Sequence, residues 1–309
     1  MTVQSETMGS RVIQSIAGTF RWCAMPLILA VVSCAGEAER PEPEPRNAGL
    51  APASGALRTV SMVPSLAELI IAIGAGEHLV ARTDYDTHPM LLDRPSIGGG
   101  LDPNLETLVG LGATVVLLAA GQDTPALQER LASVGIQGVP FQTQSIQDIY
   151  SSIRTLGVMF ERETAADSLS AYIADELQAV QSRVAGREPV SVLYVVWPDP
   201  PMTVGPGAFV DEVISLAGGR NVFEDSTIEW PTVGFESIVD RDPDVVLWPQ
   251  GEVTIGNVDR LRSTPGWRDV RAVQEGRVEL VDADLFNRPG PNVVEAARAL
   301  ARLLHPDGH

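Results

Sequence analysis

Cysteine is nearly absent from this sequence. Its two cysteines, Cys23 and Cys34, both lie close to the amino terminus. The main body of the chain therefore has no disulfide framework and no thiolate metal site. Histidine is also scarce, and two of the four histidines, His305 and His309, lie at a terminus where fraying is common. We therefore expect no metal site.

Positive charge is the next shortage. The 309 residues include 22 Lys plus Arg against 40 Asp plus Glu, which gives a net charge of −18 at pH 7. A chain this acidic repels phosphate backbones, so we expect no nucleic-acid partner. The sequence also lacks a nucleophile elbow and a His–Glu metal motif, which argues against an enzyme.

The amino-terminal segment has the features of an export signal. Arg11 and Arg21 supply positive charge, and the apolar stretch at residues 22–32 is too short to span a bilayer comfortably. Residues 31–34, Val-Val-Ser-Cys, resemble the lipobox of bacterial lipoproteins. This predicts that Cys34 is the first mature residue and carries a lipid. The alternative is an ordinary signal peptide that is cut nearby.

One stretch occurs twice. Residues 102–109, Asp-Pro-Asn-Leu-Glu-Thr-Leu-Val, correspond to residues 232–239, Thr-Val-Gly-Phe-Glu-Ser-Ile-Val, at an offset of 236 − 106 = 130. Each copy predicts a short helix, capped by Asp102 or Thr232, that leads into a buried parallel strand. A repeat at this separation indicates two similar lobes.

A second echo supports the duplication. Glu68-Leu69-Ile70 recurs as Glu212-Val213-Ile214, at an offset of 212 − 68 = 144. The motif from Ser65 to Glu68 also predicts a capping box at the start of a helix. Residues 78–83 are expected to form a strand.

A long helix is predicted between the two lobes. Residues 161–185 contain no proline or glycine, and apolar residues recur there at helical spacing. Such a helix is roughly 35 Å long. On either side of it, strands alternate with helices, which is typical of parallel sheets. The predicted fold class is therefore α/β, with two similar α/β lobes joined by a single long rigid α-helix.

The chain divides into five predicted segments. Its proline- and glutamate-rich part has no apolar periodicity and cannot form a core, so we expect a tether there. The segments are a signal peptide (1–33), the tether (34–56), an N-terminal lobe (57–160), the interlobe helix (161–186) and a C-terminal lobe (187–309).

This organisation resembles the helical-hinge substrate-binding proteins of ABC importers, and within that group most closely the cobalamin-binding proteins. The resemblance covers roughly residues 57–306. It rests on the matching segments 104–106 (Asn-Leu-Glu), 200–205 (Pro-Pro-Met-Thr-Val-Gly), 217–223 (Ala-Gly-Gly-Arg-Asn-Val-Phe), 229–231 (Glu-Trp-Pro) and 284–288 (Asp-Leu-Phe-Asn-Arg).

The resemblance implies that the protein captures a corrinoid in the cleft between the lobes, without catalysis and without a cofactor. The cleft is expected at the carboxyl ends of the strands. Two tryptophans suit the flat faces of a corrinoid, and an Asp–Arg pair suits its amide rim. The expected ligand-binding residues are Tyr85, His88, Gly99, Gly100, Trp197, Trp230, Asp284 and Arg288.

Five of these residues also have an alternative role. The tryptophans could fill cores, Asp284 and Arg288 could form a salt bridge within one loop, and His88 could be solvated. The cobalamin-binding proteins carry a tryptophan near the glycine run that ends at Gly100, and this chain does not. The alternative cargo is therefore haem or a ferric siderophore, and for haem Tyr85 or His88 would be the axial ligand.

Glu106 and Glu236 occupy equivalent places in the two repeats. The resemblance implies that they meet arginines on the two subunits of an ABC permease, because two matched carboxylates suit a two-fold partner. The alternative is that each complements the dipole of its own helix. We expect a monomer, periplasmic or at the cell surface, anchored to a membrane by the lipid on Cys34.

Overall fold

The computed structural model describes residues 57–99, 103–250 and 258–306. The predicted signal peptide and tether, Cys34, Gly100 and Asp102 lie outside these ranges. In the part of the chain that is described, no helix combines the length and the apolar character that crossing a membrane requires.

The first lobe is built on a parallel sheet with the strand order β1-β2-β3. Val60 pairs with Val116, and Val116 with Gly138, so the strand from the repeat lies in the centre. The strands are β1 (Thr59–Ser61), β2 (Val115–Ala119) and β3 (Gln137–Phe141). The helices of this lobe are α1 (Pro64–Ala72), α2 (Leu105–Gly110), α3 (Pro125–Ser133) and α4 (Ile146–Met159), with short 3-10 helices η1 (Gly76–His78) and η2 (Pro89–Leu91).

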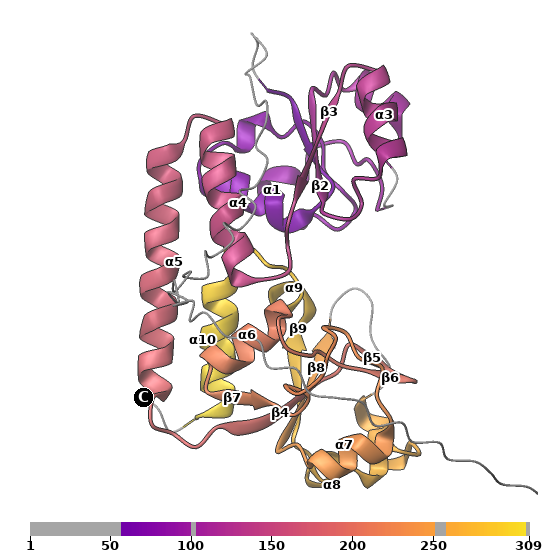
Figure 1. Cartoon of the computed structure of the whole chain (residues 1–309), viewed down its shortest axis with the longest axis vertical. Helices are drawn as coiled ribbons and strands as arrows, with labels where there is room; N and C mark the ends of the chain where they lie inside the picture. Colours follow the sequence, from indigo (N-terminus) through magenta and orange to yellow (C-terminus); the bar gives the residue numbers. More distant parts are fainter. Residues whose placement is uncertain (1–56, 100–102, 251–257, 307–309) are drawn as a thin grey trace, which may run out of the picture. The chain divides into compact units, whose positions relative to one another are not determined.

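The second lobe is built on a parallel sheet with the order β7-β4-β8-β9 and carries a small antiparallel hairpin, β5-β6 (Figure 1). Its strands are β4 (Val190–Tyr194), β5 (Trp197–Pro198), β6 (Pro201–Met202), β7 (Gly219–Asn221), β8 (Val245–Gln250) and β9 (Val278–Asp282). Its helices are α6 (Phe209–Leu216), α7 (Phe235–Arg241), η3 (Val258–Ser263), η4 (Trp267–Asp269), α8 (Arg271–Glu275), α9 (Ala283–Phe286) and α10 (Val293–Leu304).

The long helix α5 (Glu163–Val184) confirms the element predicted between the lobes. It packs against α4 of the first lobe and α10 of the second (Figure 1). Its buried residues Ile173, Leu177 and Val180 share one hydrophobic cluster with Leu117 of β2 and Leu247 of β8. The apolar core therefore runs without interruption from one sheet, past α5, to the other.

The repeat is confirmed, but its helices begin two residues later than predicted. Asn104 caps α2, because its Oδ1 accepts from the Thr107 amide at 3.1 Å. In the second copy the residue before α7 is Gly234, so Thr232 is not a cap. The first helical residues, 105 and 235, still differ by 235 − 105 = 130. The duplication therefore preserves the geometry while the capping chemistry differs.

Two other local predictions are wrong. Helix α1 starts at Pro64, whose missing amide suits the first helical position, so Ser65 lies inside the helix and caps nothing. The expected strand at 78–83 is reduced to two isolated bridges, Thr59 with Leu79 and Arg82 with Ser96. The segment touches the edge of β1 at one point and then turns away to meet residue 96.

Candidate functional site

A pocket of about 370 Å³ is lined by both lobes. Val63 and Pro64 follow β1, Thr143 follows β3, and Ala283 follows β9. The pocket therefore lies at the carboxyl ends of parallel strands, where open α/β sheets bind ligands. Its full lining is Val63, Pro64, Ser65, Tyr85, Thr143, Ala283, Asp284, Asn287, Arg288 and Pro289. Three of the residues expected to bind ligand, Tyr85, Asp284 and Arg288, are among them.

Arg288 connects the two lobes at this pocket. Its Nη2 donates to the carbonyl oxygen of Tyr85 at 2.9 Å and lies 2.8 Å from Asp284 Oδ1. Its Nη1 donates to Oε1 of Glu68 at 3.5 Å. The salt bridge of Arg288 with Asp284 thus exists, as the alternative role held, but the same guanidinium also reaches two residues of the first lobe.

Helix α9 holds Asp284 in place. Asp282 ends β9 and caps this helix, because its Oδ1 accepts from the amides of Asp284 at 2.9 Å and Leu285 at 3.4 Å. Asp284 lies in the first turn of α9 and Arg288 follows the end of this helix, so the two side chains, four residues apart, form a salt bridge across it.

Glu68 also belongs to this site, although the sequence did not predict it as a site residue. Its side chain is 12% exposed, and Oε2 accepts from Asn292 Nδ2 at 3.2 Å. Burial raises the pKa of Glu68 above its ordinary value, while the nearby positive charge of Arg288 acts in the opposite direction. The echo with Glu212 was the only signal in the sequence, and it indicated duplication rather than a site.

Asn287 is a second residue that the sequence did not single out. Its Oδ1 accepts from the hydroxyl of Tyr194 at 2.7 Å. Burial of that hydroxyl raises the pKa of Tyr194, so it stays a donor at all physiological pH values. A buried strand residue therefore orients an amide of the pocket.

Tyr85 and Gly99 lie against each other. A Cβ added at Gly99 would come within 2.8 Å of the Tyr85 ring, so the lack of a side chain makes room for that ring. His88 Nδ1 accepts from the Met90 amide at 3.2 Å and caps η2. Neither Gly99 nor His88 lines the pocket around Arg288.

Trp197 and Trp230 are 51% and 44% exposed, so neither fills a core. Trp197 is in β5, and Trp230 precedes Pro231, whose oxygen accepts from the amide of Thr203, the residue after β6, at 3.0 Å. Neither ring lines the pocket around Arg288. Trp248 and Trp267, by contrast, are buried edge to face with centroids 5.4 Å apart.

Glu106 and Glu236 are both exposed, each at the second residue of its helix. Within the described ranges neither forms an ion pair. A first-turn carboxylate complements the helix dipole, and an exposed one is also available to a partner, so the geometry is compatible with both predicted roles. Among the described residues, no three His, Cys, Asp or Glu side chains are grouped to hold a metal ion.

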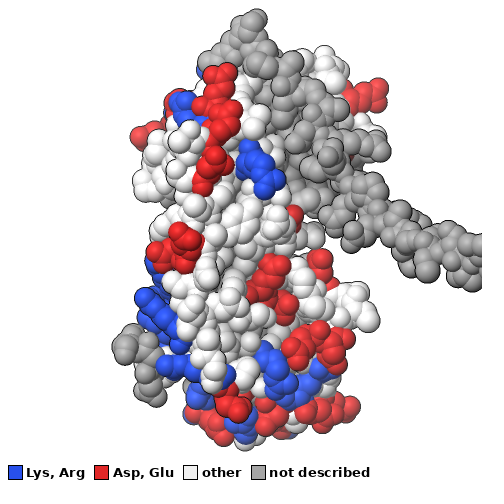
Figure 2. All heavy atoms as spheres, turned by 60° about the vertical axis from the view of Figure 1, so that its left-hand side comes forward, with Lys and Arg blue, Asp and Glu red and all other residues white. Residues whose placement is uncertain are grey.

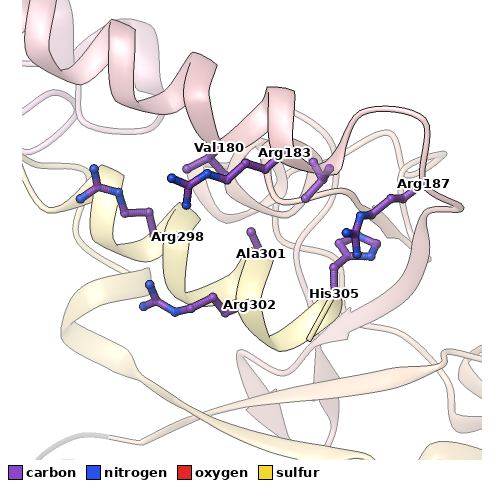
Figure 3. A pocket seen from close by; sticks show the side chains of 8 residues that line it. Val180, Arg183, Arg187, Arg298, Ala301, Arg302 and His305 are labelled. Carbon is purple, nitrogen blue, oxygen red and sulfur yellow. The ribbon is translucent and has the colours of Figure 1, made fainter. Parts of the chain in front are cut away.

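Arginines gather in a second pocket, of about 140 Å³, between α5 and α10 (Figure 3). Figure 2 shows arginines grouped in the lower half of the face that carries α5. Arg183 and Arg302 lie in the last turns of α5 and α10, where cations complement the helix dipole. Arg298 pairs with Glu176 and Glu295. Helix ends and acidic partners thus account for much of this cluster without a ligand.

Residues 60–285 match the family model described as "Periplasmic binding protein", and the chain belongs to that family. It is therefore a protein of a binding family with two α/β lobes, and its relatives serve transport rather than catalysis.

Two curated relatives are similar along most of their length. The chain is 29% identical over 258 residues to the uncharacterized ABC transporter substrate-binding lipoprotein YvrC of Bacillus subtilis, covering 81% of this chain and 80% of YvrC. It is 26% identical over 249 residues to the vitamin B12-binding protein of Vibrio cholerae, covering 80% of this chain and 88% of that protein.

Among solved structures, the periplasmic heme-binding protein BhuT, in complex with two hemes, superposes with a TM-score of 0.73 at 25% identity. The match covers 81% of this chain and 98% of BhuT. Relatives with this fold are thus named for two different metal chelates.

Proposed function

We propose that this protein is the substrate-binding component of an ABC importer and that it captures a corrinoid in the cleft between its lobes. The observation that carries the proposal is Arg288, which joins both lobes at the carboxyl ends of the strands. A ligand that enters there touches both lobes at once. The vitamin B12-binding relative supports the choice of a corrinoid.

The residues have distinct tasks in this proposal. Arg288 donates to the amide oxygens on the rim of the ligand, and Asp284 accepts from amide nitrogens. Tyr85 lines the pocket and offers an exposed ring to the flat apolar face. Trp197 and Trp230, exposed outside the pocket around Arg288, contact the part of the ligand that extends beyond it. The lobes need only a small movement to close, because one helix and a continuous core connect them.

Haem is the second candidate cargo. The similarity to a heme-binding structure supports it, as does the exposed Tyr85 beside the pocket. Tyrosine and histidine are both axial ligands of haem iron. His88 uses Nδ1 to accept from the Met90 amide, which leaves Nε2 for iron.

A titration separates these candidates. The mature protein is titrated with cyanocobalamin, haemin and a ferric siderophore, and binding is followed by tryptophan fluorescence and by calorimetry. We expect binding of cyanocobalamin with one site per chain. Binding of haemin alone would replace the corrinoid proposal with the haem one, and Tyr85→Phe would then alter the Soret band.

Delivery and anchoring complete the proposal. Glu106 and Glu236 dock onto the two permease subunits, and the protein acts as a monomer. Residues 1–33 direct export, Cys34 carries the lipid, and residues 34–56 link the lipid to the lobes. Growth with radiolabelled palmitate tests the anchor: Cys34→Ala should remove the label, and a retained label would contradict it.

A further inference from the structure

Two glutamates reach from their own lobe into the other one. Glu68 of α1 accepts from Asn292, which directly precedes α10. Glu212 of α6 accepts from the amide of Ile146, the first residue of α4, at 2.6 Å. Each carboxylate therefore meets the start of the last helix of the opposite lobe. The echo at an offset of 212 − 68 = 144 thus corresponds to a pair of matched contacts between the lobes.

The two contacts differ in one respect. In the described part of the chain, Glu212 bonds to the start of α4 in the first lobe, whereas Glu68 bonds both to Asn292 and to Arg288 of the pocket. Side chains of Glu68 and Arg288 are 12% and 16% exposed, so solvent screens their attraction only in part. The contact of Glu68 therefore holds a side chain of the pocket, and the contact of Glu212 holds the start of a helix.

The loop between Arg288 and Asn292 lies close against α1. A Cβ added at Gly290 would lie 3.1 Å from Ser65 Cβ and 3.6 Å from Glu68 Oε2. The two carboxylate oxygens of Glu68 bind the two ends of this loop: Oε1 accepts from Arg288 and Oε2 accepts from Asn292. Glu68 thus ties both ends of the loop to the first lobe.

Arg288 is the positive group that acts on Glu68. Its charge lowers the pKa of Glu68, whereas burial and the carboxylates of Asp86 and Asp284 raise it. Glu68 engages Nη1, while Tyr85 and Asp284 engage Nη2. The planar guanidinium has five N–H donors in a fixed arrangement, so fixing both ends of its fork sets the direction of the remaining donors.

We infer that Glu68 is a positioning residue of the ligand cleft, which holds the loop of residues 288–292 and directs the free donors of Arg288 toward an oxygen acceptor on the ligand. This inference rests on the proposed function, since it concerns the same cleft. Protonation of Glu68 removes the negative charge that holds Arg288. Because burial raises the pKa of Glu68, that proton binds at a higher pH than it would to a glutamate in the unfolded chain.

The test compares Glu68→Gln with Glu212→Gln as the matched control. Both substitutions remove one carboxylate between the lobes, but only the first changes a partner of Arg288. Affinity for cyanocobalamin is measured from pH 5 to 8. We expect Glu68→Gln to weaken binding about tenfold at pH 7, the loss of one hydrogen bond to a charged group, and Glu212→Gln to bind within about twofold of the wild type.

The pH profile separates positioning from general support of the fold. Affinity of the wild type should fall as the pH drops through the titration of Glu68, and this step should be absent in Glu68→Gln. Asp86 and Asp284 are present in both proteins, so they do not account for a difference between them. Glu68→Asp, which keeps the charge on a shorter side chain, should recover part of the affinity and the step.

Three results would overturn the inference. They are unchanged affinity in Glu68→Gln, an equal loss in Glu212→Gln, and a pH profile that keeps its step in Glu68→Gln. If Glu68→Gln does not fold, Glu68→Asp decides in its place, and an affinity equal to that of the wild type over the whole pH range counts against the inference.

A wild type that binds none of the ligands would contradict the proposed function instead. In that case, hydrogen exchange of the unliganded protein tests whether Glu68 holds the loop of residues 288–292. The amide of Val293, bonded to the Gly290 oxygen at 3.2 Å, should exchange faster in Glu68→Gln than in Glu212→Gln or the wild type. Equal exchange in all three proteins would refute the positioning role.

Discussion

The two lobes contain the same repeated unit and differ in what surrounds it. In both, a short helix with an exposed glutamate at its second position leads to an inner strand of a parallel sheet. The first lobe adds the loop of Tyr85, and the second adds the β5-β6 hairpin and α9. The repeated parts thus form the framework and the candidate docking points, whereas Tyr85 and the residues of α9 and the loop after it contribute to the pocket.

The largest expected effect is a loss of stability, which tests whether the repeated strands of the two lobes contribute equally to the core. Leu117 and Leu247 are separated by the offset of the repeat, 247 − 117 = 130, and both are fully buried in one cluster. Leu117→Ala and Leu247→Ala should each lower the free energy of unfolding by about 2–5 kcal/mol, through lost burial and a cavity. Urea denaturation should show one transition in each case. Separate transitions, or a loss confined to one variant, would break the comparison.

The next effect concerns the two exposed glutamates of the repeat, Glu106 and Glu236. If both contact a two-fold permease, Glu106→Ala and Glu236→Ala should reduce uptake equally, about tenfold each, and the double variant about 100-fold. Affinity for the ligand should not change. Uptake is measured with the permease reconstituted in vesicles. Normal uptake combined with a small loss of stability would indicate that the glutamates only complement their helix dipoles.

A smaller effect is expected on ligand affinity, when Arg288 of the pocket is compared with Arg183 of α5. Arg288→Ala should lower the affinity for cyanocobalamin about tenfold or more, because a guanidinium donor to the ligand is lost. Arg183→Ala changes an arginine in the last turn of α5 and should leave affinity unchanged. Calorimetry measures both. Equal losses would mean that the arginine pocket between α5 and α10 takes part in binding after all.

The smallest effect is a dependence of stability on pH. Burial raises the pKa of both Glu68 and Glu212 in the folded protein. Above the ordinary pKa of glutamic acid the folded state therefore holds more protons than the unfolded chain, and stability falls as the pH rises. Glu68→Gln and Glu212→Gln remove this decrease in stability, so each variant should gain stability relative to the wild type as the pH rises above 4.5. Urea unfolding at several pH values measures it, and parallel curves would contradict it.

Prediction from the sequence succeeded where a signal extends over many residues. The α/β class, the duplication and the helix found at Glu163–Val184 all follow from periodic patterns. It failed at single capping positions, such as Thr232 and Ser65. Several residues near a helix start have suitable side chains, and packing chooses among them. Asn104 was overlooked as a cap because Asp102 and Pro103 precede it with an equally favourable pattern.

The candidate site was predicted in part. Asp284 and Arg288 lie four residues apart in the chain, so their proximity is local, and the structure places both at the pocket with Tyr85. Glu68 lies 220 residues from Arg288, and no pattern along the chain connects the two. The separation of Trp197 and Trp230 from this pocket was also not foreseeable.

The sequence by itself determined two features. The repeat indicates two similar halves, and the regular spacing of apolar residues indicates a long helix between them, because both patterns can be recognised along the chain without knowing its tertiary contacts. Tertiary structure alone decided that Glu68 meets Arg288 and that Glu212 meets the start of α4. These contacts exist only once both lobes have packed onto α5 and α10. Burial in the folded protein then raises the pKa of Glu68 and of Glu212. In an unfolded chain the two glutamates are not buried, so their pKa is not raised.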